Sequence, residues 1–168
     1  MGTLHITFDI PGERALSSYF EHMYHVPDDF RDVWEQMSED FWAQNEQTFA
    51  EEGPGWRPLA PSTRWDRLYR GYPPSHPILV RTGALRDSLT DGTAEGAIYE
   101  VYPQELTLGS DLKTKNGYTL ATLHQFGSMK VADHPPKRPP VQITGELQTR
   151  WNQRLATWLR EEFAYGGE

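Results

Sequence analysis

The residues best suited to chemistry are six histidines and a surplus of acids, and few of them have a spacing that chemistry requires. His22 and His25 lie three residues apart in a stretch expected to be helical, a geometry that metal ions can use. A zinc site needs two further ligands, and no other histidine has a matching spacing. We therefore expect no metal ion and no cofactor.

Acid–base chemistry has one candidate pair, His124 and Asp87, and only proximity in the fold could support it. The sequence contains no Gly-rich phosphate loop with Lys-Ser/Thr, no GxGxxG and no GxSxG. It contains no cysteine, which excludes disulfides and thiolate chemistry. A small hydrolase using His124 and a carboxylate stays open as an alternative, but the main expectation is a protein that is not an enzyme.

The bulk properties predict a single globular domain over residues 1–168, because domains usually hold roughly 100–200 residues. No apolar run approaches the roughly 18 residues that a membrane span needs, and the N-terminus lacks the features of a signal peptide. We expect synthesis in the cytoplasm and no membrane contact. A net charge of −8 disfavours non-specific DNA binding, which depends on cationic contacts with phosphate.

The charges are distributed in two opposed blocks. Residues 28–52 hold nine acids against one base, Arg31, whereas residues 57–86 hold six arginines against one acid, Asp66. The acidic block has two interpretations. It is either a solvated helix face or one half of a head-to-tail contact between identical subunits, in which the arginines are the other half.

Hydrophobic spacing predicts the elements that must position these residues. Alternation over 4–10 indicates a strand, and a short helix is expected over 13–24. The strongest helix is expected over 28–52, capped by Pro27-Asp28-Asp29. Its core stripe would be Phe30, Val33, Trp34, Met37 and Phe41, and the acids Asp28, Asp32, Glu35, Glu39 and Glu46 would lie across the axis.

The second half of the chain is expected to alternate short elements with irregular segments. Residues 53–77 are rich in proline and glycine and predict a long loop or arm, with a short helix over 62–70. Thr82 is expected to cap a helix that begins at Gly83 and has Leu85 and Leu89 on its inner face. A hairpin of 98–102 and 106–109 is expected around Pro103-Gln104-Glu105, followed by a polar loop over 111–117. A helix is then expected over 118–125, ended by Gly127, and an extended and mostly exposed segment over 128–140. The last expected helix is capped by Thr144, and its apolar stripe is Leu147, Trp151, Leu155, Trp158 and Leu159.

Together these elements predict an α+β domain. A small antiparallel sheet would be packed by the long helix of the N-terminal half and by the C-terminal helix, and residues 53–77 would form the loop or arm.

Four sequence segments carry a resemblance to a known family. In chain order they are the segment with Trp56, Pro58, Leu59 and Thr63, the segment with Thr82, Gly83, Leu85 and Arg86, the run His124-Gln125-Phe126-Gly127, and the pair Arg138-Pro139. They are similar to the W-x-P-L-x-x-x-T, I-L-x-x-T-G-x-L-x-x-S, H-Q-F-G and P-x-R-P of the phage virion morphogenesis family, which includes neck and tail-completion proteins of long-tailed phages. The resemblance covers about residues 28–165.

The resemblance implies a structural protein of the virion without catalysis. Such a subunit oligomerises with itself, in a ring at the head–tail junction, and contacts other phage neck and tail proteins while DNA passes through the channel without sequence-specific binding. A tail terminator or minor tail protein of similar build is the alternative within the virion. Because an acidic wall repels phosphate, Asp32, Glu35 and Glu39 are the candidate channel-facing acids. The arginine-bearing segment 57–86 is the candidate for one subunit contact.

Overall fold

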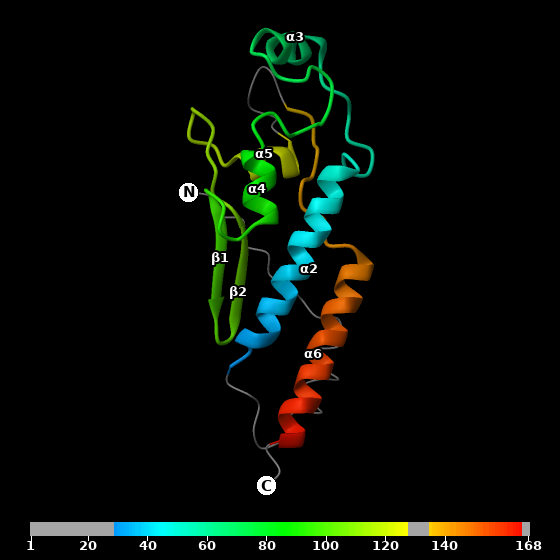
Figure 1. Cartoon of the computed structure of the whole chain (residues 1–168), viewed down its shortest axis with the longest axis vertical. Coiled ribbons are helices and arrows are strands. Elements are labelled where there is room, and N and C mark those ends of the chain that lie inside the picture. The colour runs from blue at the N-terminus through cyan, green and yellow to red at the C-terminus, as the bar shows by residue number, and fades with distance from the viewer. Residues whose placement is uncertain (1–28, 128–134, 166–168) are drawn as a thin grey trace.

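The computed structural model describes residues 29–127 and 135–165, and within them the chain forms five helices and one two-stranded antiparallel sheet. This arrangement confirms the predicted α+β class (Figure 1). The strand expected over 4–10 and the helix expected over 13–24 lie outside the described residues. The elements are α2 (Arg31–Ala50), α3 (Pro61–Tyr69), α4 (Ala84–Thr90), β1 (Ala97–Tyr102), β2 (Glu105–Ser110), α5 (Leu120–Phe126) and α6 (Gly145–Tyr165).

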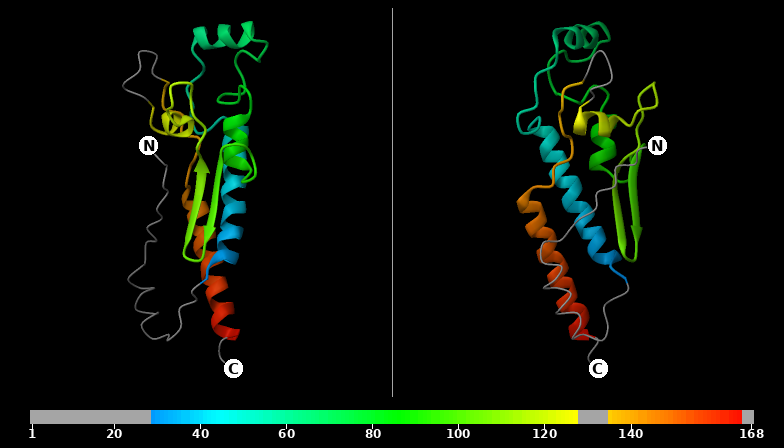
Figure 2. Two further views of the ribbon diagram at one scale, coloured as in Figure 1. Left: turned by 90° about the vertical axis from the view of Figure 1, so that its left-hand side faces the viewer. Right: turned by 180° about the vertical axis from the view of Figure 1, so that it is seen from behind.

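Helix α2 lies at the centre of the fold. Helix α6 runs beside it, and α4 and the hairpin cover another side of it (Figures 1 and 2). The predicted stripe faces this core, where Val33 and Phe41 are fully buried. All five apolar residues predicted for the last helix are also buried. These stripes share one core because residues three and four apart lie on the same helical face.

The hairpin is tighter than the sequence pattern predicted. Its register runs from Ala97 opposite Ser110 to Tyr102 opposite Glu105, so that only Pro103 and Gln104 form the turn. The expected three-residue connection was wrong by one residue, because Glu105 joins the strand. Backbone pairing explains the difference, since extending the ladder by one pair satisfies additional peptide groups.

Two of the expected helix caps differ from the structure. Helix α2 begins after Phe30 and not at residue 28, although the Asp29 carboxylate accepts a hydrogen bond from the Arg31 backbone N–H (3.1 Å) and also binds the Arg31 guanidinium. Helix α4 begins at Ala84, one residue later than expected, with Gly83 at the capping position. Thr144 does cap α6, because its Oγ1 accepts a hydrogen bond from the Leu147 N–H (3.1 Å).

One member of the acidic run is buried. Asp40 faces α6, where the Arg154 guanidinium donates to both of its carboxylate oxygens at 2.5 and 2.9 Å. A paired guanidinium and carboxylate can be buried between two helices at much lower cost than either charge alone. The described acids of α2 are therefore exposed except for Asp40, which joins α2 to α6, and after the helix Glu52 is half-buried, where its carboxylate binds His76 and the Ile78 N–H.

None of the described helices is long and apolar enough to cross a membrane.

Candidate functional site

The four sequence segments that are far apart in the chain meet at one end of α2. Arg138 is the centre of this junction, and it is buried with 5% of its surface exposed. Its guanidinium donates hydrogen bonds to the backbone carbonyls of Arg57 (2.7 Å) and Pro58 (2.9 Å). Its own backbone N–H donates to the carbonyl of His124 (2.9 Å). One residue, through its side chain and its backbone N–H, thus fixes the Trp56–Leu59 segment to the His124–Gly127 segment.

The burial of Arg138 corrects the expectation that residues 128–140 are extended and mostly exposed. Residues 128–134 lie outside the described part of the chain, and within 135–140 both Arg138 and Pro140 are buried. The partners explain this burial, because residues 57–58 offer backbone carbonyls that no helix or sheet satisfies. A guanidinium has five donors and can satisfy two such carbonyls at once.

Trp56 anchors the start of the arm. Its indole N–H donates to the Pro139 carbonyl (3.2 Å), and its ring packs edge-on against Phe49 with 5.7 Å between the ring centroids. Leu59, which is also buried, follows in the same segment. The Trp-x-Pro-Leu segment is therefore held to the core at both ends, and the arm leaves the body at a fixed place.

The residues of the His-Gln-Phe-Gly run have different structural roles. The Gln125 side chain pairs with the Val141 backbone, donating to its carbonyl (3.0 Å) and accepting from its N–H (3.2 Å). Phe126 is exposed, and Gly127 ends α5 with φ +72°. A Cβ at Gly127 would lie 3.3 Å from the Lys137 backbone nitrogen, so a side chain there would be strained and crowded.

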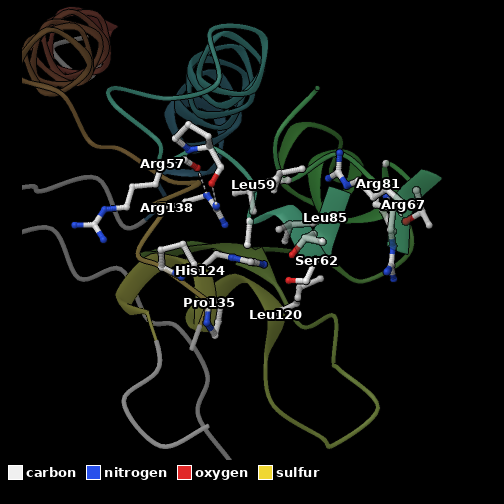
Figure 3. A pocket seen from close by; sticks show the side chains of 18 residues that line it. Arg57, Leu59, Ser62, Arg67, Arg81, Leu85, Leu120, His124, Pro135 and Arg138 are labelled. Carbon is white, nitrogen blue, oxygen red and sulfur yellow. Dashed lines mark hydrogen bonds between the residues drawn. The ribbon is translucent and has the colours of Figure 1, made fainter. Parts of the chain in front are cut away.

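A pocket of about 860 Å³ lies between the arm and this junction (Figure 3). Its apolar lining consists of prolines and leucines, among them Leu59, Leu85 and Leu120. Thr63, Thr82 and Gly83 also line the pocket. Arg86, which belongs to the same segment as Thr82 and Gly83, lies outside the pocket and binds Asp87. The charged residues that line the pocket are all arginines: Arg57, Arg67, Arg81 and Arg138.

The arginines of the pocket repel one another. Burial lowers the pKa of Arg67, which is 4% exposed, and the nearby charge of Arg81 lowers it further. The pKa of Arg138 is lowered by burial and then by the charge of Arg67. Among the described residues that line the pocket none is acidic, so the pocket has a positive potential. An oxyanion entering it would relieve this repulsion.

The sequence did not predict that Arg67 and Arg81 line one pocket. The available signal was an excess of arginine in a segment with many prolines, because such a segment leaves carbonyls that guanidinium groups can satisfy. Arg67 shows this use, since its guanidinium donates to the Pro77 carbonyl (2.9 Å).

His124 lines the same pocket without a carboxylate partner. Its Nδ1 is buried and has no hydrogen-bond partner among the described residues. Burial, and secondarily the charge of Arg138, lowers its pKa from the ordinary 6.5 to about 4. Asp87, the acid proposed to act with it, is not part of the pocket lining and is bound by the Arg86 guanidinium. The structure therefore does not bring the candidate hydrolytic pair together.

The neutral state of His124 predicts a pH dependence of stability. Because the folded-state pKa lies below the unfolded value, the unfolded chain binds this proton more tightly. The contribution of His124 is fully present above about pH 6.5 and decreases as the pH falls toward 4, by roughly 3 kcal/mol in total. Urea unfolding at pH 7 and pH 4 should show that the free energy of unfolding falls less between these two pH values in His124→Gln than in the wild type. Equal losses would contradict a buried neutral His124.

Helix α3 stands at the end of the arm, away from the rest of the fold (Figure 1). Its apolar residues recur at three- and four-residue spacing but face solvent. Trp65 is 71% exposed, Leu68 is 52% exposed and Tyr69 is 92% exposed. Monomeric proteins rarely leave such a cluster of large side chains uncovered, and clusters of this kind mark interaction sites. We call these three residues the α3 face.

The candidate channel acids lie on α2, nearer the opposite end of the molecule. Asp32, Glu35 and Glu39 are all exposed, and none forms an ion pair with another described residue. Among residues 29–127 and 135–165, no group of three or more His, Asp or Glu side chains is placed to hold a metal ion.

Comparisons with protein-family models, with curated proteins and with solved structures found no match to this chain.

Proposed function

We propose that this chain is a non-enzymatic structural subunit of a tailed-phage particle, which assembles with its own copies into a ring at the head–tail junction. The observation that carries the proposal is the uncovered α3 face, presented on an arm that is fixed to the core. A protein that functions alone gains nothing from three exposed large apolar side chains on one short helix. A subunit that binds a neighbour covers them on assembly.

The opposed charges support a second copy as the neighbour. The arm and pocket region is rich in arginine, whereas exposed acids lie elsewhere on the chain, among them Glu105 of the hairpin. A contact that closes into a ring joins two different patches of the same chain. Complementary charge favours such a head-to-tail orientation and disfavours contact between like patches.

The exposed acids of α2 also suit a passage for DNA. In the proposed ring Asp32, Glu35 and Glu39 face the channel, where negative charge keeps the DNA backbone from adhering. In a structure of the assembled ring, these three side chains on its outer surface would contradict this part of the proposal. The resemblance of the sequence segments is the reason for proposing a position between head and tail, next to other neck and tail proteins. A tail terminator with the same build is the alternative, and it would differ in its position in the particle.

The test of self-assembly replaces the α3 face without damaging the core. Deleting residues 57–77 would also remove Leu59 and Arg67, which are buried, so point substitutions are cleaner. Trp65→Gln combined with Tyr69→Gln keeps residues that favour a helix. We expect the loss of an oligomer that the wild type forms, because large aromatic anchors contribute about 2 kcal/mol or more each to an interface.

Light scattering over a range of protein and salt concentrations measures this effect. Tyr118→Gln is the control, because Tyr118 is also an exposed aromatic residue but lies outside the arm. A variant that associates as the wild type does would remove the α3 face from the interface. A wild-type chain that stays monomeric at every concentration would contradict self-assembly.

A further inference from the structure

The molecule is elongated, and its two ends differ in character. The arm, whose residues line part of the arginine pocket, is at one end, and the hairpin turn is toward the other (Figures 1 and 2). The start of α2 is tied to that turn, because the Phe30 N–H donates to the Pro103 carbonyl (2.7 Å). Phe30 also contacts Trp158 near the end of α6, with 4.9 Å between the ring centroids. The far end therefore consists of the turn and two helix ends.

Two of the four pocket arginines lie deep in the pocket. Arg67 and Arg138 are almost fully buried, so their guanidinium groups lie below the surface. The phosphates of duplex DNA lie on a stiff rod, which cannot enter such a recess. The leucine and proline lining adds apolar surface next to the charges. The fitting ligand is a thin peptide segment that carries a carboxylate beside an apolar side chain.

The turn of the hairpin has this chemistry. Glu105 is exposed and forms no ion pair with another described residue. Its cross-strand partner Tyr102 is 53% exposed, and Pro103 and Gln104 between them are exposed as well. One turn thus presents a carboxylate, an aromatic ring and a proline together. The hairpin turn and helix α3 of the arm lie toward different ends of the same subunit (Figure 1).

We propose that the hairpin turn of one copy inserts into the arginine pocket of the next copy, and that the Glu105 carboxylate binds the arginines there. This inference rests on the proposed self-assembly and specifies its two patches. The Arg81 guanidinium is a suitable partner, because it is half-exposed at the pocket and its only described ion pair, with Asp66, is long at 3.7 Å. A guanidinium binds a carboxylate through two parallel hydrogen bonds, which also fixes orientation.

The end of α6 is the competing acidic element, and its width argues against it. Glu161 and Glu162 are exposed there. A helix with its side chains is about 10–12 Å across, whereas a two-residue turn joins strands only about 5 Å apart. A narrow turn therefore fits beside the buried Arg67 and Arg138 better than the end of a helix does, whereas the half-exposed Arg81 is open to both. Glu161 therefore provides a matched control for charge at the same end of the molecule.

A charge exchange tests the contact. Glu105→Arg and Arg81→Glu should each weaken self-association about tenfold or more, and the double variant should recover most of the loss. Glu161→Arg should leave association close to that of the wild type. Sedimentation over a range of concentrations gives the dissociation constants, and urea unfolding shows whether each variant is folded.

The absence of cysteine allows a second measurement that does not depend on affinity. Gln104→Cys lies in the turn, and Ser62→Cys lies in the pocket lining. A mixture of these two variants under oxidising conditions should form a disulfide between different chains. Gln104→Cys mixed with Gln148→Cys, an exposed position on α6, should form little.

The outcomes separate this contact from the proposed function. If both single charge variants associate as the wild type does, or if Glu161→Arg is equally harmful, the turn is not the occupant of the pocket while ring assembly stands. A double variant without recovery overturns the pairing of Glu105 with Arg81. A wild type that never associates overturns self-assembly itself, and the docking with it.

Discussion

Gly53→Ala is expected to destabilise the protein by about 3–5 kcal/mol, because it displaces the tryptophan that anchors the arm. Gly53 has φ +65°, a conformation that is strained for alanine. A Cβ there would lie 2.2 Å from the Trp56 indole nitrogen, which is far inside van der Waals contact. Trp56 would have to leave its place against Phe49 and lose its hydrogen bond to the Pro139 carbonyl.

Gly55→Ala is the matched control for this substitution. Gly55 has a similar φ of +72°, but an added Cβ would meet nothing within 4 Å. The control should therefore show only the backbone strain, roughly 1 kcal/mol. Urea unfolding monitored by tryptophan fluorescence measures both variants. Equal destabilisation by the two substitutions would mean that contact with Trp56 has no role.

Regular spacing let the sequence predict the main helices and the hairpin. Val33, Met37 and Phe41 recur at helical intervals and are buried together, and Leu147 and Trp151 behave alike on α6. Such patterns depend on one face of one element and need no knowledge of its neighbours. The errors lie at the element ends, where Phe30 and Gly83 take the cap positions, because end positions depend on contacts with other segments.

Long-range polar contacts could not be predicted from the sequence. Asp40 lies within an acidic run and differs from its neighbours only by facing Arg154, which is 114 residues away. Arg138 lies among prolines and was expected in an exposed segment, yet its partners are the carbonyls of residues 57 and 58, about 80 residues earlier. A charged side chain is buried only where a partner compensates its charge or its hydrogen bonds. The spacing of residues along the chain does not identify that partner.

The sequence segments of the candidate site thus have a structural explanation that precedes any role in assembly. Trp56 and Arg138 join the arm to the body through hydrogen bonds from side chains to backbone carbonyls, and Gln125 and Gly127 hold the segment of Arg138 against α5. Their part in the proposed ring is to hold the α3 face and the pocket in one orientation. Preorganised contact residues lose less entropy on binding, so this rigidity favours assembly.

Arg138→Leu is expected to lower the free energy of unfolding by about 2–4 kcal/mol, because it removes both hydrogen bonds to the carbonyls of Arg57 and Pro58. Two carbonyls would then lack a donor at the base of the arm, where a buried acceptor without a partner is costly. Relief of the repulsion between Arg138 and Arg67 offsets part of the loss. Lys137→Leu, at the exposed neighbouring position, should change stability little.

The same substitution separates the fixation of the arm from the contacts that the arm makes. In Arg138→Leu the α3 face keeps its residues but loses its fixed position, so self-association should weaken together with the hydrogen-exchange protection of the amide of residue 138, which donates to the His124 carbonyl. In Trp65→Gln with Tyr69→Gln, amide protection should stay while association is lost. If Arg138→Leu loosened the arm and left association unchanged, the orientation of the arm would have no role in assembly, and the interface would lie elsewhere on the molecule.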